Sequence, residues 1–273
     1  QAVIDEIARW SLKHLEGIES VLLKQRQHPD DRMKNGILIA GQTLPETINE
    51  FGVNYALDLQ MNQDASFYLD TRNLRRWLLD QMAGLRVLNT FAYTGSLGVA
   101  AGAGGANQVV QSDINGNFLE LAQQSWSLNG LPDQRCKILE GDFFRVAGRL
   151  RNENRLFDAV IIDPPFFSKT SAGRVDLQQE TTRLINKVRP LAAHEGWLIV
   201  INNALFLSGA DFMDELIDLC QSPYLEFDQV IPVPTDITGY TDTIVDPPPV
   251  PPEPFNHPTK IAILKVFRKD ERK

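Results

Sequence analysis

The chain has 273 residues, a formal net charge of -8 and 43% hydrophobic residues, a composition that indicates a globular protein of one or two domains. Its two cysteines lie far apart and its four histidines lack metal-ligand spacing, so we expect no disulfide framework, no metal and a reducing, cytoplasmic compartment. No apolar run approaches the ~20 residues of a membrane span, and no signal peptide stands at the start. The acidic balance argues against broad phosphate binding but leaves room for a local basic patch.

The first 65 residues predict a small appendage. Apolar residues at helical spacing indicate an amphipathic helix over residues 1–26. Two short apolar runs follow at 36–40 and 50–59, and the second alternates in the manner of a half-buried strand. We therefore expect a helix and β-hairpin element over residues 1–65, ahead of a larger domain over residues 66–273.

The larger region alternates strands with helices. Five apolar strand candidates are expected at residues 86–91, 108–114, 136–140, 157–162 and 196–202. Helices are expected between them, for example over 115–129 and 176–194. Continuous Val, Ile and Leu strands that alternate with helices indicate a parallel sheet covered on both faces.

Two further strand candidates follow, at 225–233 and 260–267. The segment between them, 234–259, is rich in proline and cannot form a regular helix. These two strands should therefore pair antiparallel. An α/β domain with a parallel core and a C-terminal antiparallel hairpin is typical of Rossmann-like S-adenosylmethionine (SAM) methyltransferases, a variant of the doubly wound fold.

The first strand of this sheet runs into a turn with the sequence Asn-Thr-Phe-Ala-Tyr-Thr-Gly-Ser at residues 89–96. In a doubly wound sheet the ligand lies beyond the carboxyl ends of the strands, and a glycine in the turn would let the backbone approach it without a Cβ. A plain strand-to-helix turn also favours Gly and Ser, so the motif alone is only moderately specific. The candidate cofactor-binding residues here are Asn89, Phe91, Tyr93, Thr94, Gly95 and Ser96.

Acidic residues lie at the ends of the second and third strands. Asp113, with Ile114 after it, can accept hydrogen bonds from ribose hydroxyls, and its position 18 residues after Gly95 fits one βαβ unit. Asp142 can accept from an adenine amino group, and Phe143 can pack near the ring. Helix capping is the alternative role for both aspartates; the spacing favours function for Asp113, and the two roles are equally supported for Asp142.

The fourth strand runs directly into Asp163, Pro164, Pro165, Phe166 and Phe167. The two prolines hold the backbone extended, so the aspartate and nearby carbonyl groups point outward in a fixed geometry. Such acceptors can grip a planar nitrogen group, and an adjacent aromatic ring can stack on a base. An ordinary turn is the less favoured alternative. The sequence therefore predicts catalytic residues at 163–166 and a substrate contact at Phe167.

Together with Phe-Tyr-Leu-Asp-Thr-Arg at residues 67–72, these four strand ends resemble those of the bacterial large-subunit ribosomal RNA methyltransferases of the RlmI and RlmK type, over roughly residues 15–268. The resemblance implies the SAM Rossmann fold, SAM as the cofactor and methyl transfer to an RNA base. It also implies that Phe67, Asp70 and Arg72 border the cofactor, where Arg72 could pair with the methionine carboxylate. A helix start capped by Asp70 is the alternative.

The sequence departs from this family after the fifth strand. Relatives that methylate cytosine at carbon-5 carry a cysteine nucleophile there, whereas this strand ends in Asn202 and Asn203, with no cysteine. We therefore expect methylation at a nitrogen, with these two amides reading a base edge. The stiff proline-rich loop after residue 232 would wall the substrate side, where His257 could contact a phosphate or base; a structural histidine is the more common case.

Three other functions stay open at this point. A methyltransferase of proteins or small molecules could also use Asp-Pro-Pro-Phe, and the acidic charge slightly favours it. A nicotinamide dehydrogenase needs GxGxxG after the first strand, which residues 94–98 do not supply. A noncatalytic SAM-binding or RNA-binding module is opposed by the intact motif at 163–166. RNA is the expected partner, and the oligomeric state stays open.

Overall fold

The computed structural model of the chain describes residues 2–171, 173–177, 180–239 and 247–271. The chain divides into two compact units, Gln1–Tyr68 and Leu69–Lys273, and each is described by itself. Among the described residues, no helix is both long and apolar enough to cross a membrane.

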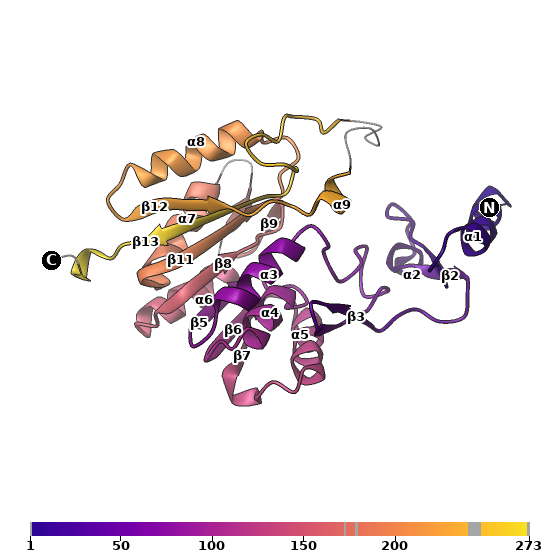
Figure 1. Cartoon of the computed structure of the whole chain (residues 1–273), viewed down its shortest axis with the longest axis horizontal. Helices are drawn as coiled ribbons and strands as arrows, with labels where there is room; N and C mark the ends of the chain where they lie inside the picture. Colours follow the sequence, from indigo (N-terminus) through magenta and orange to yellow (C-terminus); the bar gives the residue numbers. More distant parts are fainter. Residues whose placement is uncertain (1, 172, 178–179, 240–246, 272–273) are drawn as a thin grey trace. The chain divides into compact units, whose positions relative to one another are not determined.

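The first unit contains short helices and small antiparallel strand pairs (Figure 1). Its elements are α1 (Ala2–His14), β1 (Val21–Leu23), α2 (Asp31–Asn35), β2 (Ile37–Ala40), β3 (Thr47–Glu50) and β4 (Val53–Ala56). The prediction of one helix over residues 1–26 is wrong. Helix α1 ends at His14, and Gly17, with a φ of 79°, turns the chain in a conformation that a helix interior excludes. Strand β1 then pairs with β2.

The apolar run at 50–59 holds a turn and a strand rather than one continuous strand. Phe51 and Gly52 have positive φ angles of 55° and 80° and reverse the chain between β3 and β4. Tyr55 of β4 is buried, and its ring centroid lies 5.0 Å from that of Phe67. Phe67, for which the family resemblance implies a place beside the cofactor, thus packs within the first unit.

The described part of the second unit is built on a seven-stranded sheet with the order β12-β13-β11-β8-β5-β6-β7. These strands are β5 (Arg86–Thr90), β6 (Gln108–Asp113), β7 (Cys136–Glu140), β8 (Phe157–Ile162), β11 (Ala192–Asn202), β12 (Leu225–Val230) and β13 (Lys260–Val266). Strands β5 to β8 and β11 run parallel, and β13 is antiparallel to both β11 and β12. The predicted Rossmann-like sheet, with its parallel core and C-terminal antiparallel hairpin, is confirmed.

Helices cover both faces of this sheet (Figure 1). One layer contains α3 (Arg72–Gln81), α4 (Ser96–Ala103) and α5 (Gly116–Leu128), and the other contains α6 (Phe143–Asn152), α7 (Thr181–Val188) and α8 (Gly209–Cys220). Alternate strand residues face alternate layers. Leu88 and Val160, for example, join the core cluster formed with α6, α7 and α8, whereas their neighbours Val87 and Ala159 are buried outside it. Burial on both faces explains why these strands are continuously apolar.

The helix expected over residues 176–194 is shorter in the structure. A hairpin of β9 (Phe167–Lys169) and β10 (Arg174–Asp176) precedes α7. Pro190 lacks the N–H that would continue α7, and it lies in the short 3-10 helix η2 (Arg189–Leu191). Strand β11 then begins at Ala192, earlier than the expected residue 196.

Candidate active site

The candidate site lies at the edge of the sheet where β5, β6, β7 and β8 end. We call this the carboxyl edge; its last strand residues are Thr90, Asp113, Glu140 and Ile162. These strands are parallel neighbours, so the segments that follow them come together. This edge is where a doubly wound sheet binds its ligand.

The turn after β5 is held in an unusual backbone conformation. Phe91, Tyr93 and Gly95 have φ angles of 53°, 50° and 78°, a region that costs a non-glycine residue about 1–3 kcal/mol. Asp113 stabilises the turn, because its Oδ2 accepts a hydrogen bond from the Tyr93 backbone N–H at 2.9 Å. The Phe91 ring stacks on Phe143, with centroids 4.5 Å apart. The first three strand ends therefore form one connected structure.

Gly95 allows the turn to pack closely against helix α5 and strand β6. A Cβ at this position would lie 2.3 Å from the Ala122 Cβ and 2.7 Å from the Gln111 Oε1. The space on the Cβ side of the glycine is thus already filled by α5 and β6, while approach of its backbone to the cofactor stays a prediction. Thr94 before it is buried, and Ser96 after it is half-buried at the start of α4.

Asn89 lies beneath the turn, with only 1% of its surface exposed. Its Nδ2 donates to Gln111 Oε1 at 3.3 Å, while the Asn89 Oδ1 and the Gln111 Nε2 have no hydrogen-bond partner among the described residues. The expectation of a direct cofactor contact is therefore corrected, because this amide lies inside the β5–β6 region.

The Asp113 carboxylate is half-buried and oriented by backbone groups on both sides. Its Oδ1 accepts from the Asn115 N–H at 3.0 Å, and its Oδ2 accepts from the Tyr93 N–H. Each carboxylate oxygen offers a further lone pair, so both can still accept from a ligand hydroxyl. Ile114 beside it is 59% exposed and presents an apolar surface.

Asp142 caps helix α6. Its Oδ1 accepts from the backbone N–H groups of Phe144 and Arg145, at 2.9 and 3.2 Å, and its Oδ2 accepts from the Thr170 hydroxyl. The capping alternative is thus present in the structure. An adenine amino group would have to share this carboxylate with three protein donors. The ring of Phe143 is buried against Phe91.

Asp163 follows β8 with a half-buried side chain, for which no hydrogen bond is found among the described residues. Burial and, to a smaller extent, the nearby negative charge of Asp70 together raise the pKa of its carboxyl to about 7. The pKa is high because the charged form loses hydration without gaining a donor. A ligand that brings a hydrogen-bond donor would therefore be bound favourably here.

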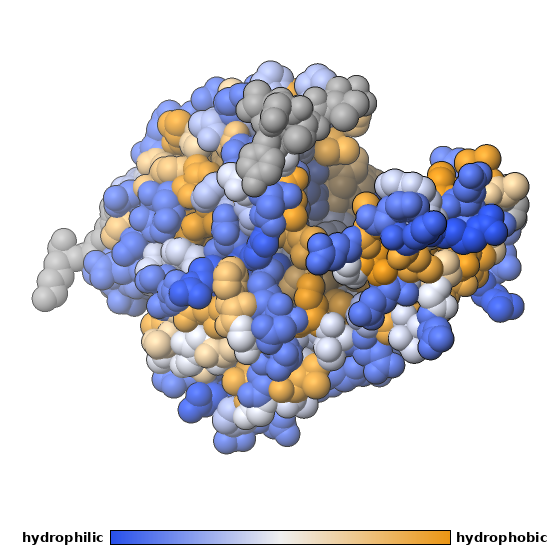
Figure 2. Space-filling view, turned by 45° about the vertical axis from the view of Figure 1, so that its right-hand side comes forward, coloured by the Kyte–Doolittle hydropathy of each residue, from blue (hydrophilic) through white to orange (hydrophobic). Residues whose placement is uncertain are grey.

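Apolar side chains remain exposed near this carboxylate. Pro164 is buried, and Pro165 is exposed. Hydrophobic and hydrophilic residues are intermixed over the surface seen in Figure 2. In the segments that follow β8 and β11, the large exposed hydrophobic residues are Phe166, Phe167, Leu205 and Phe206. Exposed aromatic rings at a ligand-binding edge suit stacking on a flat ring.

Thr259 is a site residue that the sequence did not indicate. Its Oγ1 donates to Asp70 Oδ2 at 2.7 Å, and its backbone N–H donates to His257 Nδ1 at 3.0 Å. Helix α3 begins with Thr71 as its N-cap, so Asp70 does not have the capping role considered as the alternative. Burial lowers the pKa of His257 although Asp70 opposes this shift, and the neutral ring then carries its proton on Nε2.

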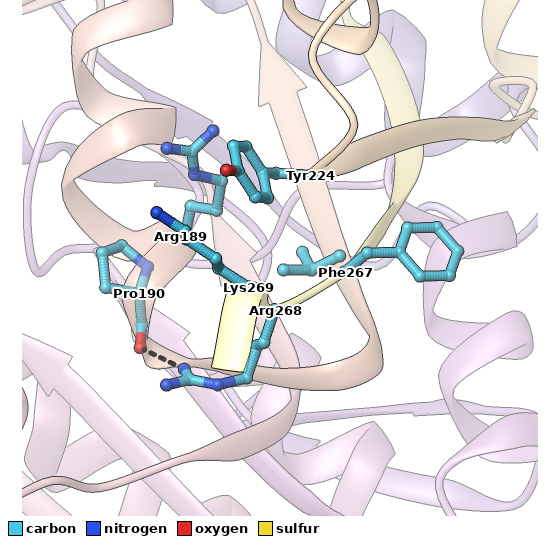
Figure 3. Close-up of a pocket in the computed structure, with 7 residues that line it drawn as sticks. Arg189, Pro190, Tyr224, Phe267, Arg268 and Lys269 are labelled. Carbon is cyan, nitrogen blue, oxygen red and sulfur yellow. Dashed lines mark hydrogen bonds between the residues drawn. The ribbon is translucent and has the colours of Figure 1, made fainter. Parts of the chain in front are cut away.

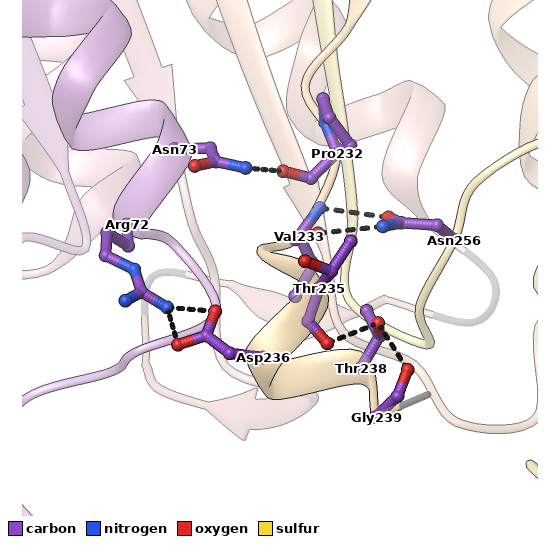
Figure 4. Close-up of polar contacts among 9 residues, drawn as sticks. All are labelled: Arg72, Asn73, Pro232, Val233, Thr235, Asp236, Thr238, Gly239 and Asn256. Atoms are coloured by element: carbon purple, nitrogen blue, oxygen red, sulfur yellow. Dashed lines mark hydrogen bonds and ion pairs between the residues drawn. The ribbon is translucent and has the colours of Figure 1, made fainter. Parts of the chain in front are cut away.

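Arg72 binds a carboxylate of the protein. Its Nη2 lies 2.6 Å from Asp236 Oδ2, in the short helix α9 (Thr235–Thr238) (Figure 4). The neighbouring Asn73 Nδ2 donates to the Pro232 carbonyl at 2.8 Å. The start of α3 is thus joined to the segment between β12 and β13. In this structure Arg72 pairs with Asp236, and its expected pairing with the methionine carboxylate stays a prediction.

Asn202 is fully buried, which corrects its expected role in reading a base edge. Its Nδ2 donates to the Leu177 carbonyl at 3.2 Å and to Thr181 Oγ1 at 3.1 Å, and its Oδ1 accepts from the Ala204 N–H at 2.9 Å. The amide therefore shapes the end of β11. Asn203 is exposed and keeps its place among the candidate substrate contacts.

Lys260 is a second residue that sequence reasoning missed. Its side chain is buried, and its Nζ donates to the carbonyls of Ala204 at 3.0 Å and Pro258 at 2.7 Å. Burial lowers the pKa of this amine to about 8. The ammonium joins the loop after β11 to the segment before β13.

Neither cysteine lies at the end of β11. Cys136 opens β7, and burial raises the pKa of its thiol to about 11; burial also raises the pKa of Cys220 in α8. Thiols with raised pKa values are poor nucleophiles. Across the described ranges, no group of three or more His, Cys, Asp and Glu residues is arranged to hold a metal ion.

Comparison with known sequences gives consistent matches. A family model for S-adenosylmethionine-dependent methyltransferases matches residues 11–245. Ribosomal RNA large subunit methyltransferase K of Neisseria meningitidis serogroup B is 35% identical over 158 residues, which are 57% of this chain and 45% of that protein. Ribosomal RNA large subunit methyltransferase I of Photobacterium profundum is 35% identical over 143 residues, which are 52% of this chain and 36% of that protein. The chain matches less than half the length of these relatives.

Comparison with solved structures shows the fold. The crystal structure of SMU.776 complexed with SAH has a TM-score of 0.81 at 22% identity, over 97% of this chain and 66% of that one. A tRNA methyltransferase of M. jannaschii has a TM-score of 0.62 at 16% identity, over 98% of this chain and 67% of that one.

Proposed function

Because this chain belongs to the S-adenosylmethionine-dependent methyltransferase family, we propose that it transfers the methyl group of SAM to a nitrogen of a base in ribosomal RNA. The observation that carries the proposal is the unpaired, half-buried carboxyl of Asp163 between the end of β8 and exposed aromatic rings. The printed names of the two bacterial relatives support ribosomal RNA as the acceptor.

The hydrogen-bond acceptors and apolar side chains of the carboxyl edge fit SAM. Asp113 offers oriented lone pairs for ribose hydroxyls, and Ile114 offers exposed apolar surface for the adenine ring. Asp142 and the stacked rings of Phe91 and Phe143 border the adenine side. When bound, SAM supplies an electrophilic methyl group on a sulfonium, so the chemistry of activation belongs to the cofactor.

The residues of this chain would act by positioning the acceptor. The Asp163 carboxylate and the Pro164 carbonyl accept hydrogen bonds from a planar nitrogen group, which aligns its lone pair with the methyl group. Phe166 and Phe167, which are 46% and 54% exposed, stack on the base. His257 Nε2 and the Asn203 amide are available for further polar contacts.

A nitrogen acceptor fits the nucleophiles that the chain offers. Methylation of carbon-5 of cytosine requires covalent activation of the ring by a thiolate. Cys136 has a pKa raised to about 11, and neither it nor Cys220 lies at the end of β11. A base nitrogen carries its own lone pair and needs no such residue.

The test is methyl transfer from labelled SAM to total ribosomal RNA, followed by mass spectrometry of the nucleosides. We expect label on one base nitrogen, lost in Asp163→Ala while SAM still binds. Label on carbon-5 of cytosine would overturn the nitrogen assignment, and label on protein alone would overturn RNA as the acceptor. Calorimetry with Asp113→Ala tests the cofactor site: we expect SAM affinity to fall by about tenfold or more, and unchanged affinity would remove Asp113 from it.

A further inference from the structure

A pocket of about 250 Å³ opens at the edge of the sheet opposite the carboxyl edge. We call this the amino edge; it is where β12 begins and β13 ends. Arg189 and Pro190 of η2, Tyr224 before β12, and Arg268 and Lys269 after β13 line the pocket. Figure 3 shows their side chains around one opening. The proposed methyl transfer uses none of these residues.

Three cations line this pocket, and its described lining contains no carboxylate. Arg268 is bound to the protein: its Nη1 donates to the Pro190 carbonyl at 3.1 Å, and Glu271 lies 4.0 Å from its Nε. Arg189 and Lys269 differ, because neither forms an ion pair with a carboxylate in the part of the chain that the structure describes. Two positive charges of the lining therefore have no carboxylate partner among the described residues, in a chain whose net charge is -8.

Arg189 is oriented by an aromatic ring. Its guanidinium carbon lies 5.6 Å from the centroid of the Tyr224 ring, an arrangement that holds the side chain without using its N–H donors. A guanidinium held on a ring, beside an ammonium, is well suited to bind a phosphate oxygen. The pocket thus has the chemistry of a phosphate site.

The distance between the two edges suits a single strand of RNA. Strand β13 runs from Lys260 at the carboxyl edge to Val266 in the pocket lining, which corresponds to roughly 20 Å at ~3.3 Å per residue. Nucleotides along a stacked strand are ~3.4 Å apart. A phosphate about six nucleotides from the target base would therefore reach the pocket.

We propose that the pocket formed by Arg189, Tyr224 and Lys269 binds a backbone phosphate of the RNA substrate, several nucleotides from the methylated base. This inference rests on RNA as the proposed substrate. Phosphate contacts fix the position of a nucleic acid without reading its sequence. The pocket therefore raises the affinity for RNA and leaves the chemical step at the carboxyl edge unchanged.

The test compares two double variants that each remove two positive charges. Arg189→Gln with Lys269→Gln alters the pocket, and Arg135→Gln with Arg151→Gln is the control, since both control residues are exposed and lie on η1 (Asp133–Arg135) and α6. Fluorescence anisotropy with a labelled single-stranded RNA of mixed sequence measures Kd over a range of KCl concentrations. Thermal melting verifies that both variants fold.

We expect the pocket variant to bind RNA about tenfold more weakly near 100 mM KCl. The slope of log affinity against log KCl concentration should become shallower by about 1 for each lost phosphate contact. Its KM for ribosomal RNA should rise, while kcat and the calorimetric Kd for SAM stay at the wild-type values. In the anisotropy measurement, the loss of RNA affinity in the control variant should be less than half of the loss in the pocket variant. Equal losses in the two variants would overturn the proposal.

Two further outcomes distinguish failure of the phosphate-site proposal from failure of the proposed function. If inorganic phosphate binds the wild type but not the pocket variant by calorimetry, while both double variants bind RNA alike, the pocket takes free anions and the RNA assignment is wrong. If the wild type methylates no RNA yet the pocket variant alone loses RNA binding, the proposed function fails and the phosphate site stands.

Discussion

The Thr259 hydroxyl donates to the Asp70 carboxylate at 2.7 Å, across 189 positions of the sequence. This bond ties the segment before α3 to the segment before β13. Thr259 is buried, so loss of the donor leaves Asp70 with less compensation at the carboxyl edge. The relationship supports a first prediction about how the site is held together.

Thr259→Val keeps the shape of the side chain and removes the donor. We expect the free energy of unfolding to fall by about 1–2 kcal/mol and methyl transfer to fall with it, as measured by urea titration and label from SAM. Thr259→Ser keeps the hydroxyl and is the matched control, with activity close to wild type. Equal activities of the valine and serine variants would show that the bond does not serve the site.

The pH dependence of activity should report on Asp163. Its pKa is raised to about 7, and only the ionised carboxylate accepts two hydrogen bonds from the acceptor nitrogen. We therefore expect kcat/KM to increase with pH through about 7 and then level off. Asp163→Asn should be slower and should lack this rise; a rise that persists in the variant would assign the titration to another group.

Asp163 should also lower stability at high pH. Between its ordinary value of 3.8 and about 7, the folded protein holds a proton that the unfolded chain has lost, so stability contributed by this group falls as pH rises across that window. Asp163→Asn removes the ionisable group and with it this loss of stability. We expect it to be more stable than wild type by ~2–4 kcal/mol near pH 8 and nearly equal near pH 4, by urea titration; a constant difference would contradict the raised pKa.

Gly95→Ala should be strongly destabilising. The substitution places a Cβ 2.3 Å from that of Ala122, at a residue with a φ of 78°. Steric overlap and backbone strain together should lower the free energy of unfolding by about 2–4 kcal/mol. Gly148→Ala is the matched control in α6, where nothing lies within 4 Å of the added Cβ, and it should stabilise by about 0.5–1 kcal/mol. Thermal melting separates the two; similar effects would mean that α5 can move away.

The ion pair of Arg72 with Asp236 makes a fifth prediction. The two side chains are 27% and 57% exposed, so their coupling energy in a double-mutant cycle should be below about 1 kcal/mol. We expect Arg72→Gln to keep its calorimetric affinity for SAM within about twofold. A loss well above tenfold would restore the cofactor role that the family resemblance implies.

Sequence patterns predicted the parts of the fold that depend on local periodicity. Strands β7 and β8 occupy the expected residues; for β8 the reason is that a parallel strand buried on both faces is almost continuously apolar. The end of α1 and the start of β11 were missed, since Gly17 and Pro190 interrupt helices that the apolar spacing alone would continue.

In the candidate site, too, sequence patterns predicted some residues and missed others. Asp113 ends β6 and Asp163 follows β8, so both candidates could be proposed from neighbouring residues. Thr259 and Lys260 could not, because their partners are Asp70 and Ala204, which are remote in sequence. Asn202 was assigned to the substrate although burial directs its amide to Leu177 and Thr181, and burial cannot be inferred from the residue type.

The place of β13 in the sheet has a consequence for synthesis. Strand β12 joins the sheet only through β13, which lies between β11 and β12. Until the ribosome has released residues up to Val266, β11 has an open apolar edge of the kind that pairs with other chains. The sheet therefore closes late, and a nascent chain arrested before β13 should depend on chaperones far more than one arrested after it.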